Sequence, residues 1–91
     1  MFRWNPDKNR ALSETRGISF DEVVQAVCDG CAVADVPHWN QGKYPGQRIL
    51  IVRIADYVYL VPYVKAGDDY FLKTIIPSRK AKRKYTEPRH D

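Results

Sequence analysis

The sequence predicts an α+β domain in which helices pack on one face of an antiparallel sheet of about four to five strands. Two helices are expected before the sheet and one short basic helix after it. Apolar residues recur at helical spacing over residues 19–28, and β-branched and aromatic segments follow between residues 31 and 76. A dense run of Lys and Arg then begins at residue 79. The 91 residues, of which 44% are hydrophobic, suit a single domain over residues 1–91 with one modest core.

A short strand and a first helix are expected at the N-terminus. Residues 2–4 place two aromatic residues around an arginine, as in a brief strand or a clip on a sheet edge. Asn5 can cap the helix that follows, because Pro6 suits the first helical position. The helix is expected over residues 7–15, and Gly17 can adopt the left-handed conformation that ends it.

A second helix is predicted immediately downstream. Ser19 and Glu22 have the spacing of a capping box, and an apolar stripe follows at helical spacing, formed by Phe20, Val23, Val24 and Val27. A CxxC segment at residues 28–31 ends this helix. A zinc ribbon needs a second cysteine pair, which the chain lacks, and a redox motif belongs at a helix N-terminus. We therefore expect two small buried thiols here.

The sheet is expected to come from the middle of the chain. Its predicted strands are residues 31–36, 47–54, 57–65 and 70–76. Within the third strand, Tyr57, Tyr59 and Tyr63 fall on one face, which makes them candidates for an aromatic surface. Pro62 in the same strand predicts a sheet edge or a β-bulge, because proline cannot donate to the ladder.

The basic segment determines the net charge of the chain. Five of the six residues from 79 to 84 are cationic, in a helix expected over residues 79–86 and capped by Ser78. Residues 1–77 carry nine cations and nine acids, so the excess of +4 lies at the C-terminal end. Cations in the first helical turns oppose the helix dipole and repel one another. This cost favours a role in binding RNA or DNA; the alternative is a solvated tail or a site for an acidic protein partner. Residues 87–91 are expected to fray.

Several classes of protein are excluded by the sequence. No apolar run approaches 18 residues and no signal-peptide pattern is present, so we expect a cytoplasmic protein without a membrane partner. Phosphate-binding glycine loops and the G-x-S-x-G motif are missing. There is no acidic cluster for a two-metal nuclease, and we expect no metal or other cofactor.

RNA cleavage by attack of the 2′-hydroxyl requires a base, an acid and cations that stabilise the phosphorane. We expect Arg79, Arg53 and Lys73 to stabilise charge, and His38 or Tyr63 to move protons. The alternative for His38 is an ordinary surface residue of a loop, and His90 is given no role. The residues expected to contact nucleic acid are Lys80, Lys82, Arg83, Lys84, Tyr85 and Arg48.

Two groups of residues suggest a family. The N-terminal group is Phe2, Trp4, Lys8, Gly17, Ile18 and Phe20, and the C-terminal group is Ile75, Ile76, Ser78, Arg79, Lys80 and Ala81. On these residues the chain resembles the BrnT-type toxins of bacterial type II toxin–antitoxin systems, a branch of the RelE-like ribonucleases. The resemblance covers most of the chain and implies a RelE-like fold. It also implies metal-independent RNA cleavage, inhibition of translation and neutralisation by a ribbon-helix-helix antitoxin, with operator DNA contacted only through the antitoxin complex.

The matching positions carry the family's RNA-contact roles onto Arg79 and Lys80. The chain departs from the family's usual residues at four positions, Leu12, Thr15, Arg16 and Thr74. Two alternatives remain open. One is a non-catalytic module whose basic end binds nucleic acid or an antitoxin, and the other is a degenerate family member that only binds the antitoxin.

Overall fold

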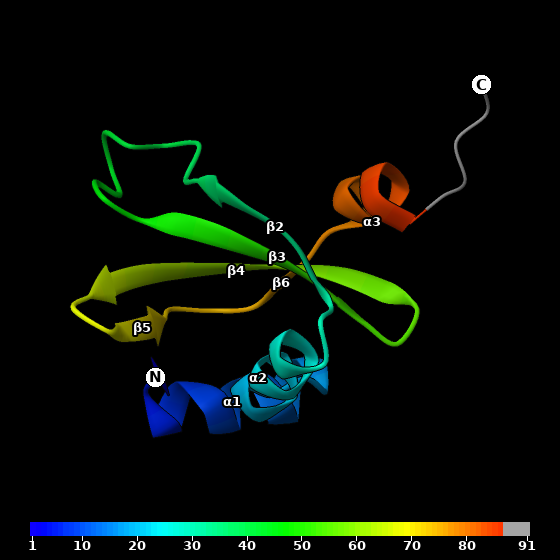
Figure 1. The fold of residues 1–91 in the computed structure, drawn as a ribbon. Helices are drawn as coiled ribbons and strands as arrows, with labels where there is room; N and C mark the ends of the chain where they lie inside the picture. The colour runs from blue at the N-terminus through cyan, green and yellow to red at the C-terminus, as the bar shows by residue number, and fades with distance from the viewer. Residues whose placement is uncertain (87–91) are drawn as a thin grey trace.

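The computed structural model describes residues 1–86, which form a mixed six-stranded sheet with helices on both faces (Figure 1). The elements in chain order are β1 (Phe2–Arg3), α1 (Pro6–Arg16), α2 (Phe20–Cys28), β2 (Ala32–Pro37), β3 (Arg48–Ile54), β4 (Tyr57–Ala66), β5 (Asp69–Leu72), β6 (Ile76–Pro77) and α3 (Arg79–Thr86). The predicted α+β class is confirmed. Expectations for residues 87–91, His90 included, lie outside the described residues. In the described part of the chain, no helix has the length and apolar character needed to cross a membrane.

Both N-terminal helices begin where the sequence predicted. The Asn5 side chain accepts hydrogen bonds from the backbone N–H groups of Asp7 and Lys8, at 2.8 and 3.2 Å. Gly17 ends α1 in the left-handed region, with φ at 68°. The Ser19 hydroxyl accepts from the Glu22 N–H at 3.2 Å and so caps α2. These caps satisfy donors that the first helical turn leaves without partners, which is why local sequence locates the helix ends.

A single asparagine fixes α2 against α1. The Asn9 amide oxygen accepts from the Phe20 N–H at 2.7 Å, and its nitrogen donates to Asp21 at 3.0 Å. Leu12 and Phe20 then enter the core, and Trp4 stacks on Phe20 with ring centroids 5.8 Å apart. The helical pair therefore reaches the sheet as one unit.

The sheet is mixed, which corrects the prediction of a purely antiparallel one. Its order is β1-β5-β4-β3-β2, and the four strands from β2 to β5 form the expected antiparallel meander. The short strand β1 pairs in parallel with β5, with Phe2 opposite Tyr70. Arg3 adds a 2.8 Å bond to Asp69. The predicted edge position of residues 2–4 is confirmed.

The predicted strand 70–76 is interrupted, because a β-bulge separates β5 from β6. Tyr63 pairs with Leu72 and Leu60 pairs with Ile76, so three residues of one strand lie opposite two of β4. Pro62 lies at this break, and its carbonyl accepts the Lys73 N–H at 2.8 Å. The Pro62 nitrogen, which has no hydrogen to donate, faces this same side of β4, where the ladder of hydrogen bonds is already interrupted. The bulge was predicted correctly; the alternative of a sheet edge is wrong, because β4 has neighbours on both sides.

Each face of the sheet has its own apolar cluster. Under α1 and α2, the sheet contributes Leu50, Val52, Val61, Tyr63 and Leu72 to a core shared with Phe20. On the other face, Ile49, Ile51 and Val58 pack against Ala81 of α3. Figure 1 shows α3 across the sheet from α1 and α2. The expectation that all helices share one face is therefore wrong for α3.

The tyrosine face of β4 is covered, which corrects the prediction of an aromatic binding surface there. Tyr63 is only 2% exposed, and Tyr59 packs partly buried against the same core. The alternation of side chains was predicted correctly. Which face the N-terminal helices cover is a tertiary property, and they cover the face that carries these tyrosines.

Candidate nucleic-acid interface

The basic helix α3 is held by one cap and one apolar face. The Ser78 hydroxyl accepts the Ala81 N–H at 3.0 Å, as the sequence predicted. Ala81 is 8% exposed and contacts the sheet, and Tyr85, one turn later, packs beside it. The sheet thereby fixes the orientation of a helix whose exposed cations are Arg79, Lys80, Arg83 and Lys84.

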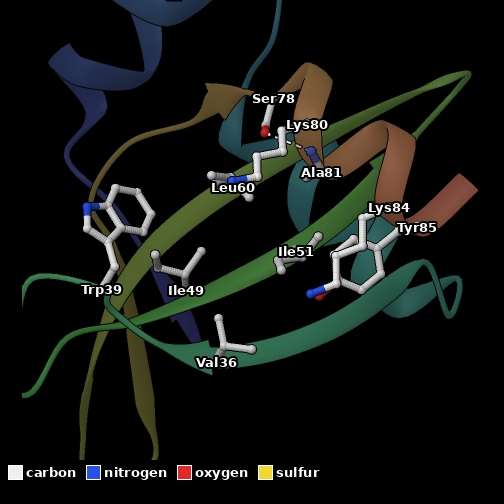
Figure 2. Close-up of a pocket in the computed structure, with 10 residues that line it drawn as sticks. All are labelled: Val36, Trp39, Ile49, Ile51, Leu60, Ser78, Lys80, Ala81, Lys84 and Tyr85. Atoms are coloured by element: carbon white, nitrogen blue, oxygen red, sulfur yellow. Dashed lines mark hydrogen bonds between the residues drawn. The ribbon is translucent and has the colours of Figure 1, made fainter.

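A pocket of about 530 Å³ lies between α3 and the sheet, and we call it the α3 pocket. Its floor is aliphatic and comes from three neighbouring strands, through Val36, Ile49, Ile51 and Leu60. Figure 2 shows Trp39 at one end and Tyr85 at the other, with the aliphatic side chains between them. Lys80 and Lys84 of α3 also line it. The pocket therefore combines an apolar floor with ammonium groups along one side.

A second pocket of about 390 Å³, here called the His38 pocket, adjoins the loop between β2 and β3. The bulge between β5 and β6 contributes Lys73 and Thr74. The loop contributes His38, Trp39, Asn40, Lys43, Tyr44 and Gln47. Trp39 lines both pockets, so the two hollows meet at its ring.

Internal hydrogen bonds hold the loop of the His38 pocket in place. The His38 N–H donates to the Gln47 carbonyl at 3.0 Å, which joins the two ends of the loop. The Tyr44 N–H donates to the Asn40 carbonyl at 2.9 Å, and the Gln41 side chain donates to the His38 carbonyl at 2.8 Å. This network fixes the loop backbone that carries the aromatic and basic side chains.

His38 is buried, whereas an ordinary surface residue was the alternative expected from the sequence. It is 6% exposed, and its ring lies 4.5 Å from those of both Trp39 and Tyr44. Its Nδ1 accepts the Asn40 N–H at 3.0 Å, so the neutral ring carries its proton on Nε2. Neither ring nitrogen then has a free lone pair. His38 is suited to donating a hydrogen bond and not to taking a proton from a 2′-hydroxyl.

Tyr63 belongs to a hydrogen-bond network on the other face of the sheet. Its hydroxyl donates to Asp35 at 2.7 Å, and Arg48 donates to the same carboxylate at 3.0 Å. The pKa of Tyr63 is raised to about 12. Burial of the hydroxyl is the larger cause, and its hydrogen bond to Asp35 is the second. The hydrogen bond from Arg48 to Asp35 raises the pKa of the guanidinium as well. Neither Tyr63 nor Arg48 lines the two pockets, so this geometry favours a structural role for both.

The remaining predicted residues divide between these pockets and other surfaces. Arg53 borders a separate hollow whose lining includes two carboxylates, from Glu22 in the first turn of α2 and from Asp29 at its C-cap. Arg79 and Arg83 are exposed on α3 and line neither pocket. The Lys82 ammonium lies 5.5 Å from the centre of the Tyr57 ring. Of the predicted site residues, the structure brings His38 and Lys73 into one pocket and Lys80, Lys84 and Tyr85 into the other.

Sequence reasoning missed three residues of the site: Trp39, Lys43 and Tyr44. Trp39 is 69% exposed, which is uncommon for so large an apolar side chain. A signal for these residues was present, because four aromatic or basic residues fall within one seven-residue loop segment, from 38 to 44. That these loop residues share a pocket with Lys73 depends on the bulge between β5 and β6, and residue spacing in the sequence does not predict it.

The charge of the two pockets is one-sided. Their linings include four lysines, Lys43, Lys73, Lys80 and Lys84, and no Asp or Glu. The hollow beside Arg53, by contrast, includes two carboxylates. Lysines without paired carboxylates near a low-dielectric floor attract anions more strongly than compensated pairs do. The lining of the two adjoining pockets is therefore cationic in composition, which makes them the candidate site for an anionic ligand.

No metal site is formed by the residues that the structure describes, among which no three His, Cys, Asp or Glu side chains cluster as ligands. The CxxC thiols are free, with Cys28 exposed and Cys31 partly buried. The expectation of two buried thiols is therefore wrong for Cys28, which lies at the exposed C-terminal end of α2.

No family model matches the chain, and comparison with curated proteins and with solved structures also finds no match. The fold and site therefore define the class of the protein on their own. It is a small α+β domain with a mixed sheet, a basic C-terminal helix and two lysine-lined pockets that meet at an exposed tryptophan.

Proposed function

We propose that this protein is the toxin of a type II toxin–antitoxin system, and that it is a metal-independent endoribonuclease that inhibits translation. The observation that carries the proposal is the lining of the two adjoining pockets, which holds four lysines and no carboxylate beside the basic helix. A RelE-like arrangement, cytoplasmic location and neutralisation by a ribbon-helix-helix antitoxin belong to the same proposal. They are supported by the sequence resemblance, and the α+β class of the fold is compatible with a RelE-like arrangement.

The chemistry proposed for the site is electrostatic. A phosphorane formed by attack of the 2′-hydroxyl gains negative charge on its equatorial oxygens. Lys43 and Lys73 lie in the His38 pocket, where they can stabilise that charge, and the Nε2–H of His38 can donate to an oxygen. Lys80 and Lys84 can hold the neighbouring phosphates along α3. In this scheme the 2′-hydroxyl loses its proton to water and its oxygen forms a bond to phosphorus. The bond from phosphorus to the 5′-oxygen then breaks, and the 5′-oxygen takes a proton from water.

Replacement of Lys73 by Ala tests the ribonuclease proposal. Purified protein incubated with total RNA in EDTA should release products that end in a 2′,3′-cyclic phosphate. Because Lys73 is placed to neutralise the phosphorane, Lys73→Ala should lower the cleavage rate by about 10- to 100-fold. Lys65→Ala is the matched control, since Lys65 is exposed on β4 and lines neither pocket. Equal cleavage by both variants would remove Lys73 from the mechanism.

A second candidate function is a non-catalytic module that binds RNA or an antitoxin. Its specific support is the state of the two residues that were expected to move protons. The acceptor lone pair of neutral His38, on Nδ1, already accepts the Asn40 N–H, and the Tyr63 hydroxyl is buried against Asp35. Salt-dependent RNA binding with no cleavage product would favour this candidate over the ribonuclease.

Growth of bacteria that express the protein separates toxin from module. We expect expression alone to arrest growth, and co-expression of a cognate ribbon-helix-helix antitoxin to restore it. Arg79→Ala should reduce the arrest through weaker RNA contact. Normal growth with abundant folded protein would contradict the toxin proposal.

A further inference from the structure

Trp39 is the structural link between the two pockets. Its indole ring is 69% exposed and belongs to the lining of both hollows. One side is supported by His38, at a ring distance of 4.5 Å, and Tyr44 supports His38 in turn. The hydrogen-bonded loop keeps this cluster of three tilted rings in place. An aromatic ring that is rigidly backed and open on its outer side is a stacking platform for a flat, apolar partner.

Lysines are arranged on both sides of this platform. Lys43 and Lys73 lie in the His38 pocket, whereas Lys80 and Lys84 lie in the α3 pocket beyond Trp39 (Figure 2). A ligand that spans both hollows would therefore meet cations before and after the indole. Alternation of flat rings and negative charges is a property of a nucleotide chain.

We propose that the two adjoining pockets bind single-stranded RNA, with one base stacked on Trp39 and the flanking phosphates contacted by Lys43 and Lys73 on one side and Lys80 and Lys84 on the other. The inference rests on the proposed function and specifies its substrate class. A base inside a duplex is stacked on both faces by its neighbours, so it has no free face to stack on the indole of Trp39. The site therefore selects unpaired nucleotides.

The polar lining of the His38 pocket favours RNA over an acidic peptide. Asn40, Gln47 and Thr74 contribute amide and hydroxyl groups, which pair with the donor and acceptor edges of unstacked bases. An acidic peptide would satisfy the four lysines, but its carboxylates have no flat face to stack on an indole, and because they only accept hydrogen bonds they cannot pair with the amide oxygens of the lining. Charge and shape together therefore point to a nucleotide chain.

Fluorescence of Trp39 provides a direct test. The chain has two tryptophans, and Trp4 packs on Phe20 away from the pockets, so Trp4→Phe leaves Trp39 as the only indole. We expect a ten-nucleotide single-stranded RNA to quench this emission to saturation. The same RNA annealed to its complement should bind at least tenfold more weakly. If Trp4→Phe does not fold, the difference between the wild-type protein and Trp39→Phe supplies the same signal.

Affinity of the variants measures the stacking. Loss of one base–aromatic stack costs about 1–3 kcal/mol, so Trp39→Ala should weaken single-strand binding by about 5- to 150-fold. Trp39→Phe keeps a ring and should retain most of the affinity. Equal binding of single strand and duplex, or an unchanged affinity in Trp39→Ala, would overturn the inference.

The same experiment distinguishes this inference from the proposed function. Cleavage of total RNA without any quenching of Trp39 would leave the ribonuclease in place and overturn the stacking site. Saturable quenching without cleavage would support the stacking site and contradict the ribonuclease. If polyglutamate displaces the RNA and quenches Trp39 as strongly, the surface is a protein-docking site and the inference is wrong.

Discussion

At the residue scale, the Tyr63 hydroxyl couples stability to pH. It donates a hydrogen bond to the Asp35 carboxylate, to which Arg48 also donates. The pKa of this hydroxyl is about 12 in the folded protein, against 10.0 ordinarily. Between pH 10 and 12 the unfolded chain has therefore lost this proton while the folded chain keeps it. The free energy of unfolding falls as pH rises through that window and is unaffected by this group below pH 10.

The Tyr63→Phe variant tests this coupling. Near pH 8 we expect a loss of about 1 kcal/mol in the free energy of unfolding, because the hydrogen bond from the Tyr63 hydroxyl to the Asp35 carboxylate is removed. The difference in the free energy of unfolding between the wild-type protein and Tyr63→Phe should shrink between pH 10 and 12, since the variant has no hydroxyl at this position to ionise. Urea unfolding at pH 8, 10 and 11.5 measures it.

The matched control for this prediction is Tyr57→Phe. Tyr57 is a phenol on the same strand, and its hydroxyl has no part in the Asp35 network. Its difference from the wild-type protein should stay constant over the same pH range. A constant difference in Tyr63→Phe as well would show that the network does not hold the Tyr63 proton.

At the element scale, α3 is a short helix of eight residues that packs on one face of the sheet. An isolated helix this short is unstable in water, and cations in its first turn oppose its dipole. The Ser78 cap and the packing of Ala81 on the sheet compensate for that cost. The basic helix is consequently the element whose folding a small change can disturb.

Removal of the cap is expected to act on α3 before it acts on the rest of the fold. Ser78→Ala should destabilise the helix by about 1 kcal/mol and weaken RNA binding severalfold, because Lys80 and Lys84 lose their fixed position. Hydrogen exchange of the α3 amides and an RNA titration measure the two effects. The control is Ser13→Ala, an exposed serine in α1, which should change neither. Unchanged exchange in Ser78→Ala would show that the cap is dispensable.

Element boundaries were largely predictable from the sequence, whereas the site was predictable only in part. The caps at Asn5, Ser19 and Ser78 depend on residues within one helical turn, so local sequence contains them. The positions of Tyr63 and His38 depend on which sheet face is covered and on how the 38–47 loop closes. Those are contacts between distant residues, and composition and periodicity do not encode them.

At the scale of the whole molecule, positive charge is concentrated on one side of a body that is otherwise balanced. Residues 1–77 carry equal numbers of acids and bases, yet the two pockets collect four lysines and no carboxylate. Binding at this surface should release counterions from the phosphates that the lysines contact. Affinity for RNA is therefore expected to depend strongly on salt.

The salt dependence has an expected size. Each phosphate contact of a single strand contributes a slope of about −0.7 to log Kobs against log salt, so four lysines give about −3. The double replacement Lys43→Gln and Lys73→Gln should reduce the magnitude of the slope by about 1.4. Lys65→Gln, outside both pockets, should leave it unchanged. A slope near zero in the wild-type protein would remove nucleic acid as the ligand.

The irregularity between β5 and β6 also has a consequence for how the molecule transmits disturbances. The Arg16 guanidinium donates to the Ile75 carbonyl at 2.6 Å, and two residues earlier Lys73 lines the His38 pocket. One hydrogen bond and two residues of backbone therefore connect the end of α1 with the proposed phosphate contact. A displacement of the C-terminal end of α1 is expected to shift the backbone that carries Lys73.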